Sequence, residues 1–377
     1  MSNLRSEQRM KVLHLNAGNE TGGGMVHILS LLNQFNREEF YLGLLEHGTF
    51  ETKAKEMEVN TIVFGQTTRY DVSVLFKIIQ FIKEHHIDIV HTHGPRANLY
   101  GYFIRKFTKT VWMTTVHSDP RNDFLGRGLK GNLFTRLNLA VLKAPDHYFA
   151  ISKRFAQMME DFGVQHNKIT TILNGIDFDK KSTNRISSEE LKLNPLDFVI
   201  LMVARFDPVK RHELAILAME KVLKKYPSVK LLFVGDGPSR ENIEELVKNK
   251  DLTENIRFLG HREDVESFYK LCDLTLLTSK TESFPLVLLE SSREKTTVIT
   301  TDVGGVRDMI PDSSYGFVLG DDNPDDISDA IMTAIELKET GKLREMGEKF
   351  FNFASQNFSI QSTADSIYQT YKKFVHE

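Results

Sequence analysis

The stretch FVILMVARFDPVKRHELAILAMEKVLKKYPSVKLLFVGDG (198–237) contains the pattern that decides the fold. It begins with one apolar run, FVILMVARF (198–206), and ends with another, KLLFVGDG (230–237). Continuous rather than alternating apolar residues are typical of a parallel strand that is buried on both faces. Between the two runs, HELAILAMEKVLKKY (212–226) has a helical period. Strand, helix and strand in this order predict a βαβ unit.

The same alternation of short apolar runs and helical segments extends along most of the chain. In the first half we expect strands at 11–17, 41–46, 61–65, 88–93, 111–117 and 147–152. In the second half we expect further strands at 256–261, 274–279 and 297–305. The polar segment KKSTNRISSEELKLNPLD (180–197) has no strand pattern and separates the halves. We therefore predict an α/β protein with two doubly wound, Rossmann-like parallel-sheet domains, facing each other across a cleft where ligands bind at the strand ends.

Length and composition fit this organisation. The chain has 377 residues, too many for one hydrophobic core, and its net charge of −3 argues against a general nucleic-acid binder. The single cysteine, Cys272, cannot form an internal disulfide, which suits a reducing compartment. Residues 1–16 contain no apolar signal-peptide core, and no apolar run approaches the ~20 residues that span a bilayer. We therefore expect a cytoplasmic protein, at most peripheral on the inner membrane face.

Two glutamates bracket the apolar stretch TESFPLVLLE (281–290). We expect a helix to begin near Phe284 with Ser283 as its N-cap, because serine often caps helices. The free N–H groups at a helix N-terminus suit a phosphate. Glu282 and Glu290 could then bind the hydroxyls of a sugar and of a ribose, with a diphosphate between them. Two solvated surface charges are the alternative, and the segment alone does not decide between these readings.

Basic and glycine-rich segments follow two other strands. Arg205 lies at the end of the strand at 198–206, and Lys210 and Arg211 come a few residues later. Cations at a strand end could neutralise a departing diphosphate, although a basic surface loop would look the same. The glycines of NETGGGMVHILSLL (19–32) open a helix, where backbone amides can approach a phosphate closely. A plain tight turn explains these glycines equally well.

Three histidines are candidates for polar chemistry. His91 and His93 share one face of their strand, but no neighbouring Asp, Glu or Cys is spaced to complete a metal site with them. His117 ends the strand at 111–117, where a histidine suits polar chemistry near neutral pH. A histidine with a purely structural role is the alternative.

The segment RNDFLGRGLKGNLFTRLNLAVLK (121–143) is both basic and amphipathic. Such a stretch can bind an anionic membrane surface or an anionic acceptor. A domain helix with a solvated basic edge is the alternative, and it is the interpretation that we favour.

Taken together, these motifs resemble those of the retaining glycosyltransferases of family 4, which have the GT-B fold and use nucleotide sugars. The resemblance extends over nearly the whole chain. Its specific part is the E-x7-E of ESFPLVLLE (282–290), with the R-x4-K of Arg205 and Lys210 and the turn GDGP (235–238). One departure is SSREKTTVIT (291–300), where the family usually has Ala-Met-Ala and a Gly-x-Pro, so the helix must end without that glycine.

The resemblance implies a role for each candidate residue. The two glutamates would bind hydroxyls of the donor sugar and of the ribose, and the two strand-end cations would hold the diphosphate. Arg262 would lie beside the nucleobase, and His117 would lie beside the reacting carbon. The implied catalytic set is His117, Arg205, Lys210 and Glu282. The implied donor-binding set is Gly23, Gly24, Arg262, Ser283, Phe284, Pro285, Leu286, Val287 and Glu290.

The resemblance also implies domain limits and an activity. The acceptor-binding domain would be 1–180 with a closing helix at 357–377, and 195–356 would bind the nucleotide sugar. We expect a hexosyl group to move, with retention, from a nucleotide sugar (UDP-sugar favoured over GDP-sugar) to an acceptor hydroxyl, without a metal or other cofactor. The acceptor could be lipid-linked, and the product a cell-surface polysaccharide, a glycolipid or a small-thiol glycoside. The alternatives are a 2-epimerase or phosphorylase of the same fold, or a non-catalytic nucleotide-sugar-binding subunit.

Overall fold

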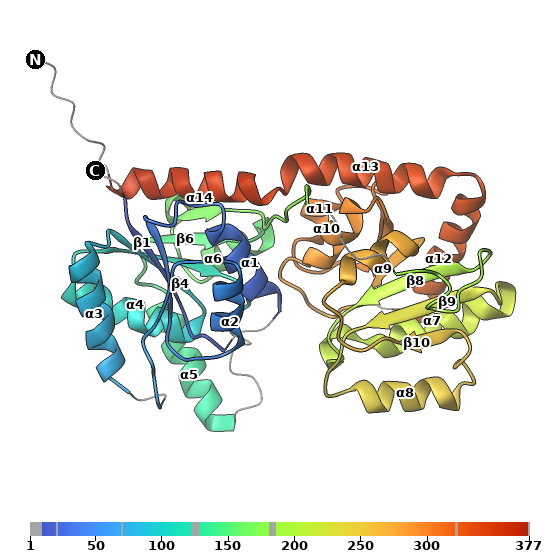
Figure 1. Ribbon diagram of the computed structural model, residues 1–377, viewed down its shortest axis with the longest axis horizontal. Helices are drawn as coiled ribbons and strands as arrows, with labels where there is room; N and C mark the ends of the chain where they lie inside the picture. Colours follow the sequence, from blue (N-terminus) through green and yellow to red (C-terminus); the bar gives the residue numbers. More distant parts are fainter. Residues whose placement is uncertain are drawn as a thin grey trace, which may run out of the picture. The chain divides into compact units, whose positions relative to one another are not determined.

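The computed structural model describes residues 10–19, 22–68, 71–121, 128–180, 186–320 and 323–375. The chain forms two compact units (Figure 1): the first extends to Gly175 and resumes at Ile360, and the second is Ile176–Ser359. The second unit thus begins earlier than the predicted residue 195. The reason is that the backbone after Gly175 bonds within the second unit. The Ile176 N–H donates to the Phe358 carbonyl, and Arg293 donates to the Asp177 carbonyl, each at 3.0 Å.

The first unit is built on a seven-stranded parallel sheet with the order β3-β2-β1-β4-β5-β6-β7. Its strands are β1 (Val12–Asn16), β2 (Phe40–Leu44), β3 (Thr61–Val63), β4 (Ile89–His93), β5 (Val111–Val116), β6 (His147–Ala150) and β7 (Ile169–Thr171). The strand order reverses between β1 and β4. The carboxyl ends of these two strands therefore form a topological switch point, where sheets of this type commonly bind ligands.

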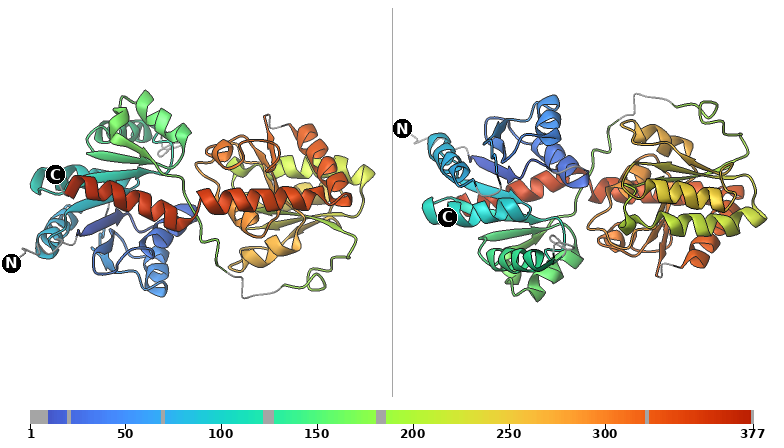
Figure 2. Two further views of the ribbon diagram at one scale, coloured as in Figure 1. Left: turned by 90° about the horizontal axis from the view of Figure 1, so that it is seen from above. Right: turned by 90° about the horizontal axis from the view of Figure 1, so that it is seen from below.

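Helices cover both faces of the first sheet. One apolar core joins the sheet to α1 (Gly23–Leu32), α2 (Thr49–Glu56) and α14 (Ile360–Val375). The other joins it to α3 (Ser73–His85) and α4 (Pro95–Phe107). Helix α14, the last in the chain, runs along this sheet (Figure 2). The remaining helices of this unit are α5 (Gly128–Val141), α6 (Lys153–Asp161) and the short η1 (His166–Lys168).

The second unit repeats this architecture with six parallel strands in the order β10-β9-β8-β11-β12-β13, reversing between β8 and β11. The strands are β8 (Phe198–Val203), β9 (Val229–Val234), β10 (Ile256–Phe258), β11 (Leu274–Leu277), β12 (Thr297–Thr301) and β13 (Phe317–Leu319). The helices are η2 (Pro208–Lys210), α7 (His212–Lys225), α8 (Arg240–Asn249), α9 (Val265–Leu271), α10 (Leu286–Arg293), α11 (Val306–Met309), α12 (Pro324–Glu339) and α13 (Lys342–Asn357). One core contains residues of α7, α8 and α12, and another contains residues of α9.

The predicted fold class, two doubly wound parallel sheets, is confirmed, and every predicted strand is present. The sequence missed β7 and β13. Each has only three residues, and neither contains a fully buried one, so neither produces an apolar run long enough to recognise.

Candidate functional site

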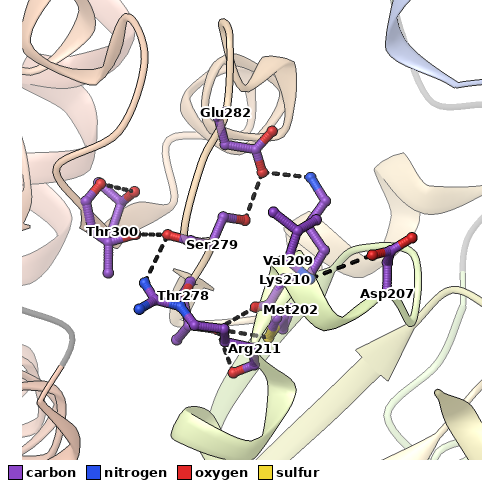
Figure 3. Close-up of polar contacts among 10 residues, drawn as sticks. Met202, Asp207, Val209, Lys210, Arg211, Thr278, Ser279, Glu282 and Thr300 are labelled. Carbon is purple, nitrogen blue, oxygen red and sulfur yellow. Dashed lines mark hydrogen bonds and ion pairs between the residues drawn. The ribbon is translucent and has the colours of Figure 1, made fainter. Parts of the chain in front are cut away.

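Lys210 and Glu282, which lie 72 residues apart in the sequence, meet in the second unit (Figure 3). The Lys210 ammonium donates to Glu282 Oε1 at 2.5 Å, and the Ser279 hydroxyl donates to the same oxygen at 2.6 Å. Both charged side chains are mostly buried, with 23% and 14% of their surfaces exposed. Lys210 follows β8 and Glu282 follows β11, so the pair lies at the switch point of the second sheet.

The loop that holds Lys210 is tied to the end of β11 by several hydrogen bonds. The Thr278 hydroxyl donates to the Lys210 carbonyl at 2.8 Å. Arg211 donates in turn to the Thr278 and Ser279 carbonyls, at 2.8 and 2.9 Å. The sequence grouped Arg211 with the cations aimed at a diphosphate. The structure assigns Arg211 to joining two loops, because backbone carbonyls occupy its guanidinium.

Arg205 is an exposed side chain at the carboxyl end of β8, as predicted. Its backbone is fitted closely against the GDG turn after β9. A Cβ atom at Gly235 would lie 2.0 Å from the Ala204 carbonyl oxygen, and one at Gly237 would lie 2.5 Å from the Phe206 carbonyl oxygen. Both glycines have a positive φ. The turn therefore sets where the backbone of Arg205 lies, a role that the motif alone did not reveal.

A second glycine contact shapes the segment around Glu282. Gly304 follows β12 with φ +53°, and a Cβ atom there would lie 2.4 Å from the carbonyl oxygens of both Glu282 and Ser283. The N–H of Gly305 donates to the Ser283 carbonyl at 2.9 Å. The sequence identified 297–305 only as a strand and missed Gly304 as a residue that positions Glu282. A side chain at Gly304 would force the loop outward.

The predicted N-cap at Ser283 is wrong. Helix α10 begins at Leu286, its N-cap is Pro285 in an extended conformation, and no side chain caps it. The Ser283 carbonyl is bonded to Gly305 and Phe284 is buried, and the chain bends at these two residues before the helix begins. The helix still presents first-turn amides at Leu286 and Val287, because the first N–H groups of a helix have no partner within it.

Glu290 is not a solvated surface charge, which was the alternative left open above. It is partly buried, and the Tyr269 hydroxyl donates to its Oε2 at 3.0 Å. Burial raises the pKa of the Glu290 carboxyl. Arg262, also in the predicted donor-binding set, forms two hydrogen bonds with Asp264 at 2.8 and 2.7 Å and lies 5.4 Å from the Phe268 ring.

The predicted residues of the first unit also gather at its switch point. Gly22, with φ +90°, precedes α1, and a Cβ atom at Gly22 or Gly23 would meet nothing within 4 Å. Gly24 belongs to the first turn of the same helix. One turn farther along, His27 packs edge-on against His117, with their ring centroids 5.6 Å apart. The glycine-rich helix start and His117 therefore belong to one site within this unit, and His27 is a member that the sequence did not single out.

Among the described residues, the contacts recorded for His117 are with other imidazoles. Its Nε2 lies 3.0 Å from Nδ1 of His93, and burial lowers the pKa of His117 to about 3. His91 and His93 share a strand face, as predicted, and His14 lies beside His91 on the neighbouring strand β1, where it contacts His93 and Tyr371 of α14. A histidine that stays neutral at physiological pH can give or accept a hydrogen bond, but it is a weak base.

The basic segment 121–143, for which membrane contact was one of two interpretations, is described only in part, since 122–127 lie outside the described residues. Within the rest, α5 exposes Leu133, Phe134 and Leu137. None of the described helices has both the length and the apolar character that crossing a membrane requires.

Comparison with known proteins identifies relatives along most of the chain. The description "Glycosyltransferase Family 4" matches residues 21–180, and "Glycosyl transferases group 1" matches residues 184–350. N-acetyl-alpha-D-glucosaminyl L-malate synthase of Bacillus anthracis is 26% identical over 92% of this chain and 89% of its own length. Alpha-monoglucosyldiacylglycerol synthase of Streptococcus pneumoniae is 24% identical over 75% of this chain and 66% of its own. A crystal structure of Anabaena HepE in complex with UDP has a TM-score of 0.85 at 21% identity, covering 97% of this chain and all of that one.

Proposed function

The chain belongs to glycosyltransferase family 4 and has the GT-B fold, and from this premise we propose that it moves a hexosyl group from a nucleotide sugar to an acceptor hydroxyl with retention of configuration. A UDP-sugar is the donor that we favour over a GDP-sugar, and the solved HepE complex with UDP supports that choice. The second unit binds the donor in this proposal, and the first unit provides His117 and the acceptor site.

The observation on which the proposal depends is the convergence of Lys210 and Glu282 at the switch point of the second sheet. Lys210 and Glu282 come from two different loops, and both side chains are mostly buried. One is a cation and the other a carboxylate, so the pair is complementary to a sugar linked to a diphosphate. The cation suits the diphosphate, and a carboxylate can accept hydrogen bonds from neighbouring sugar hydroxyls. Before the donor binds, each neutralises the other, which keeps both side chains in place.

The remaining residues follow from that placement. Arg205, Lys210 and the first amides of α10 stabilise the negative charge that develops on the diphosphate, and such preorganised electrostatics is often the largest catalytic contribution. Glu290 binds the ribose hydroxyls, Arg262 lies beside the base, and the amides at Gly23 and Gly24 assist with the phosphates. The proposal gives the cationic role to side chains and requires no metal ion, so activity should survive EDTA.

The bond between the anomeric carbon and the diphosphate oxygen breaks, an oxocarbenium-like state forms, and the acceptor oxygen bonds to the same face of the sugar. The acceptor proton passes to the departing diphosphate, because His117, with its pKa lowered to about 3, is too weak a base to take it. His117 instead offers a hydrogen bond near the reacting carbon.

For the acceptor, we propose a lipid-linked hydroxyl reached at an anionic membrane surface. Helix α5 exposes three apolar side chains, and Arg136 and Lys143 add positive charge to the same segment. One curated relative is named a glucosyldiacylglycerol synthase, which agrees with a lipid acceptor. Co-sedimentation should show binding to anionic but not zwitterionic vesicles, and Leu133→Ser with Leu137→Ser should abolish it. Equal pelleting of the double variant would rule out this contact.

The donor is tested by thermal shift against a panel of nucleotides and nucleotide sugars. A ligand at 100 times its Kd should stabilise the protein by ~2.7 kcal/mol. A labelled donor that gives stabilisation is then incubated with candidate acceptors, and the anomeric configuration of the product is read by NMR. An inverted product would overturn retention. Epimerised donor, or sugar phosphate formed from inorganic phosphate, would establish one of the alternative enzymes, and binding without any product would indicate a non-catalytic subunit.

A further inference from the structure

A path of hydrogen-bonded side chains begins at His117 and continues into the interior of the first unit. Nε2 of His117 is 3.0 Å from Nδ1 of His93, and Nε2 of His93 is 2.9 Å from Nδ1 of His14. Nε2 of His14 is 3.2 Å from the hydroxyl of Tyr371. The same hydroxyl bonds to Nδ1 of His91, whose Nε2 lies 2.7 Å from the Thr115 hydroxyl. The path therefore connects the candidate catalytic histidine to the last helix of the chain.

The residues of this path come from four elements that the sheet brings together. His14 lies on β1 opposite His91 on β4, and His93 lies two residues farther along β4 on the same face. Tyr371 reaches them from α14, 357 residues after His14. Apart from His117, all the members of the path are at most 2% exposed. Bulk water therefore cannot substitute for a missing partner.

The geometry does not favour a metal ion here, although nitrogen atoms of His14, His91 and His93 lie within 4.8 Å of one another. Every one of these nitrogens already has a hydrogen-bond partner: His14 bonds to His93 and Tyr371, His91 bonds to Tyr371 and Thr115, and His93 bonds to His14 and His117. A metal ion would have to break these bonds to bind here.

The tautomers of the four histidines in the path depend on one another. Burial lowers the pKa values of His14, His91, His93 and His117 far enough to keep each ring neutral at pH 7, with a single N–H. If the Tyr371 hydroxyl donates to His14, each of the four rings must carry its proton on Nδ1 to satisfy every bond. If it donates to His91, each must carry its proton on Nε2. No mixture of Nδ1 and Nε2 tautomers satisfies every hydrogen bond of the path.

We infer that His93, His14 and Tyr371 are positioning residues for His117: they hold its ring in one orientation and set which of its nitrogens bears the proton. The inference rests on the proposed function only in giving His117 a part in the reaction. In one arrangement the free Nδ1 of His117 offers a proton to the substrate, and in the other it offers a lone pair. The hydroxyl of a residue on α14 thus governs the hydrogen bond that His117 can make.

The first test does not depend on activity. Protein labelled with ¹⁵N-histidine is studied at neutral pH by NMR, which distinguishes protonated from unprotonated ring nitrogens. We expect His14, His91, His93 and His117 to share one tautomer. Different tautomers within this set, or a cationic ring, would overturn the inference whether or not the protein is a transferase.

The second test is Tyr371→Phe, with Tyr368→Phe on the same helix as the matched control. Loss of the hydroxyl should leave His117 as a mixture of tautomers and lower kcat about 10-fold, with the donor KM unchanged, by analogy with the loss of a partner that orients a metal-bound histidine. The control should change neither quantity. If Tyr371→Phe keeps both the single tautomer and the kcat, the positioning role is refuted. If kcat also stays unchanged in His117→Ala, it is the proposed role of His117 that fails.

Discussion

The two units place polar side chains at equivalent positions, the carboxyl ends of the strands on either side of a switch point, but they use opposite chemistry there. In the first unit these side chains are neutral imidazoles, which burial keeps uncharged. In the second unit they are full charges, Lys210 paired with Glu282, tied to backbone and hydroxyl groups. The same topology therefore supports a site that hydrogen-bonds and a site that neutralises charge.

The proposed function would give this difference a physical reason. A site for a diphosphate needs cations, and buried charged side chains must be paired and partly solvated to be stable. A group beside the reacting carbon would meet less charge and could be buried. Substitutions and pH changes should therefore affect the two sites differently.

The charged site is tested most directly by Lys210→Ala. The substitution removes the cation expected to meet the developing diphosphate charge and leaves Glu282 without its partner. We expect turnover to fall by ~10²- to 10³-fold, by analogy with the loss of one oxyanion-stabilising group. Steady-state kinetics would measure this. Lys248→Ala, at an exposed lysine on α8, is the control and should be neutral. Normal turnover in Lys210→Ala would remove Lys210 from the mechanism.

Gly304→Ala tests how much activity depends on the position of the loop that contains Glu282, with all charges kept. The new Cβ atom would collide with the carbonyls of Glu282 and Ser283 at a positive φ, so the loop must move. We expect about 10- to 100-fold lower kcat/KM, because small displacements of positioned groups are costly, and a stability loss of about 1–3 kcal/mol. Gly320→Ala, where a Cβ atom meets nothing, is the matched control. Equal effects of the two substitutions would contradict the positioning role.

The buried neutral histidines should make the stability of the first unit sensitive to acid. Among the described residues, His14, His27, His91, His93 and His147 are buried in the first unit, against His212 in the second. Burial lowers the pKa of His14 to about 3 and that of His27 to about 4, below the value of about 6.5 in the unfolded chain. Below pH 6.5 the unfolded state binds more protons than the folded state. Each such histidine therefore costs about 1.4 kcal/mol of stability per pH unit, down to its folded pKa.

We therefore expect the first unit to unfold at a higher pH than the second on acid titration. The only tryptophan, Trp112, is buried in β5 of the first unit, so its fluorescence reports on that unit alone. Circular dichroism reports on the whole chain. The fluorescence change should come first as the pH falls, and coincident transitions would show that the two units do not differ in this respect.

The smallest effect is expected from Tyr269→Phe, which removes the hydrogen bond to Glu290. That bond lowers the pKa of Glu290 against the raising effect of burial, so without it the pKa rises further and the carboxylate needs a higher pH to form. We expect the donor KM to rise about fivefold, the value of one hydrogen bond of about 1 kcal/mol, and more at low pH. A KM that is independent of pH in both proteins would argue against a ribose-binding carboxylate at Glu290.

The sequence by itself determined the fold class and indicated which strand ends carry the charged candidate residues. Strands buried on both faces, such as β8, are continuous apolar runs, and α7 has its own helical period, so both are visible locally. The residues just after β8 and β11 were identified for the same reason, because charged residues mark where a buried apolar strand ends. The Ser283 cap failed because Ser283 is held outside the helix by a backbone bond from Gly305, which no local pattern records.

Only the tertiary structure decided which of these residues meet. The ion pair of Lys210 with Glu282 and the contacts of Tyr371 with His14 and His91 join positions 72, 357 and 280 residues apart. Such contacts depend on the order of strands within each sheet and on the return of α14 to the first unit. Periodicity shows which residues are buried or turn outward, but it contains no information about the neighbour that a strand or helix will find.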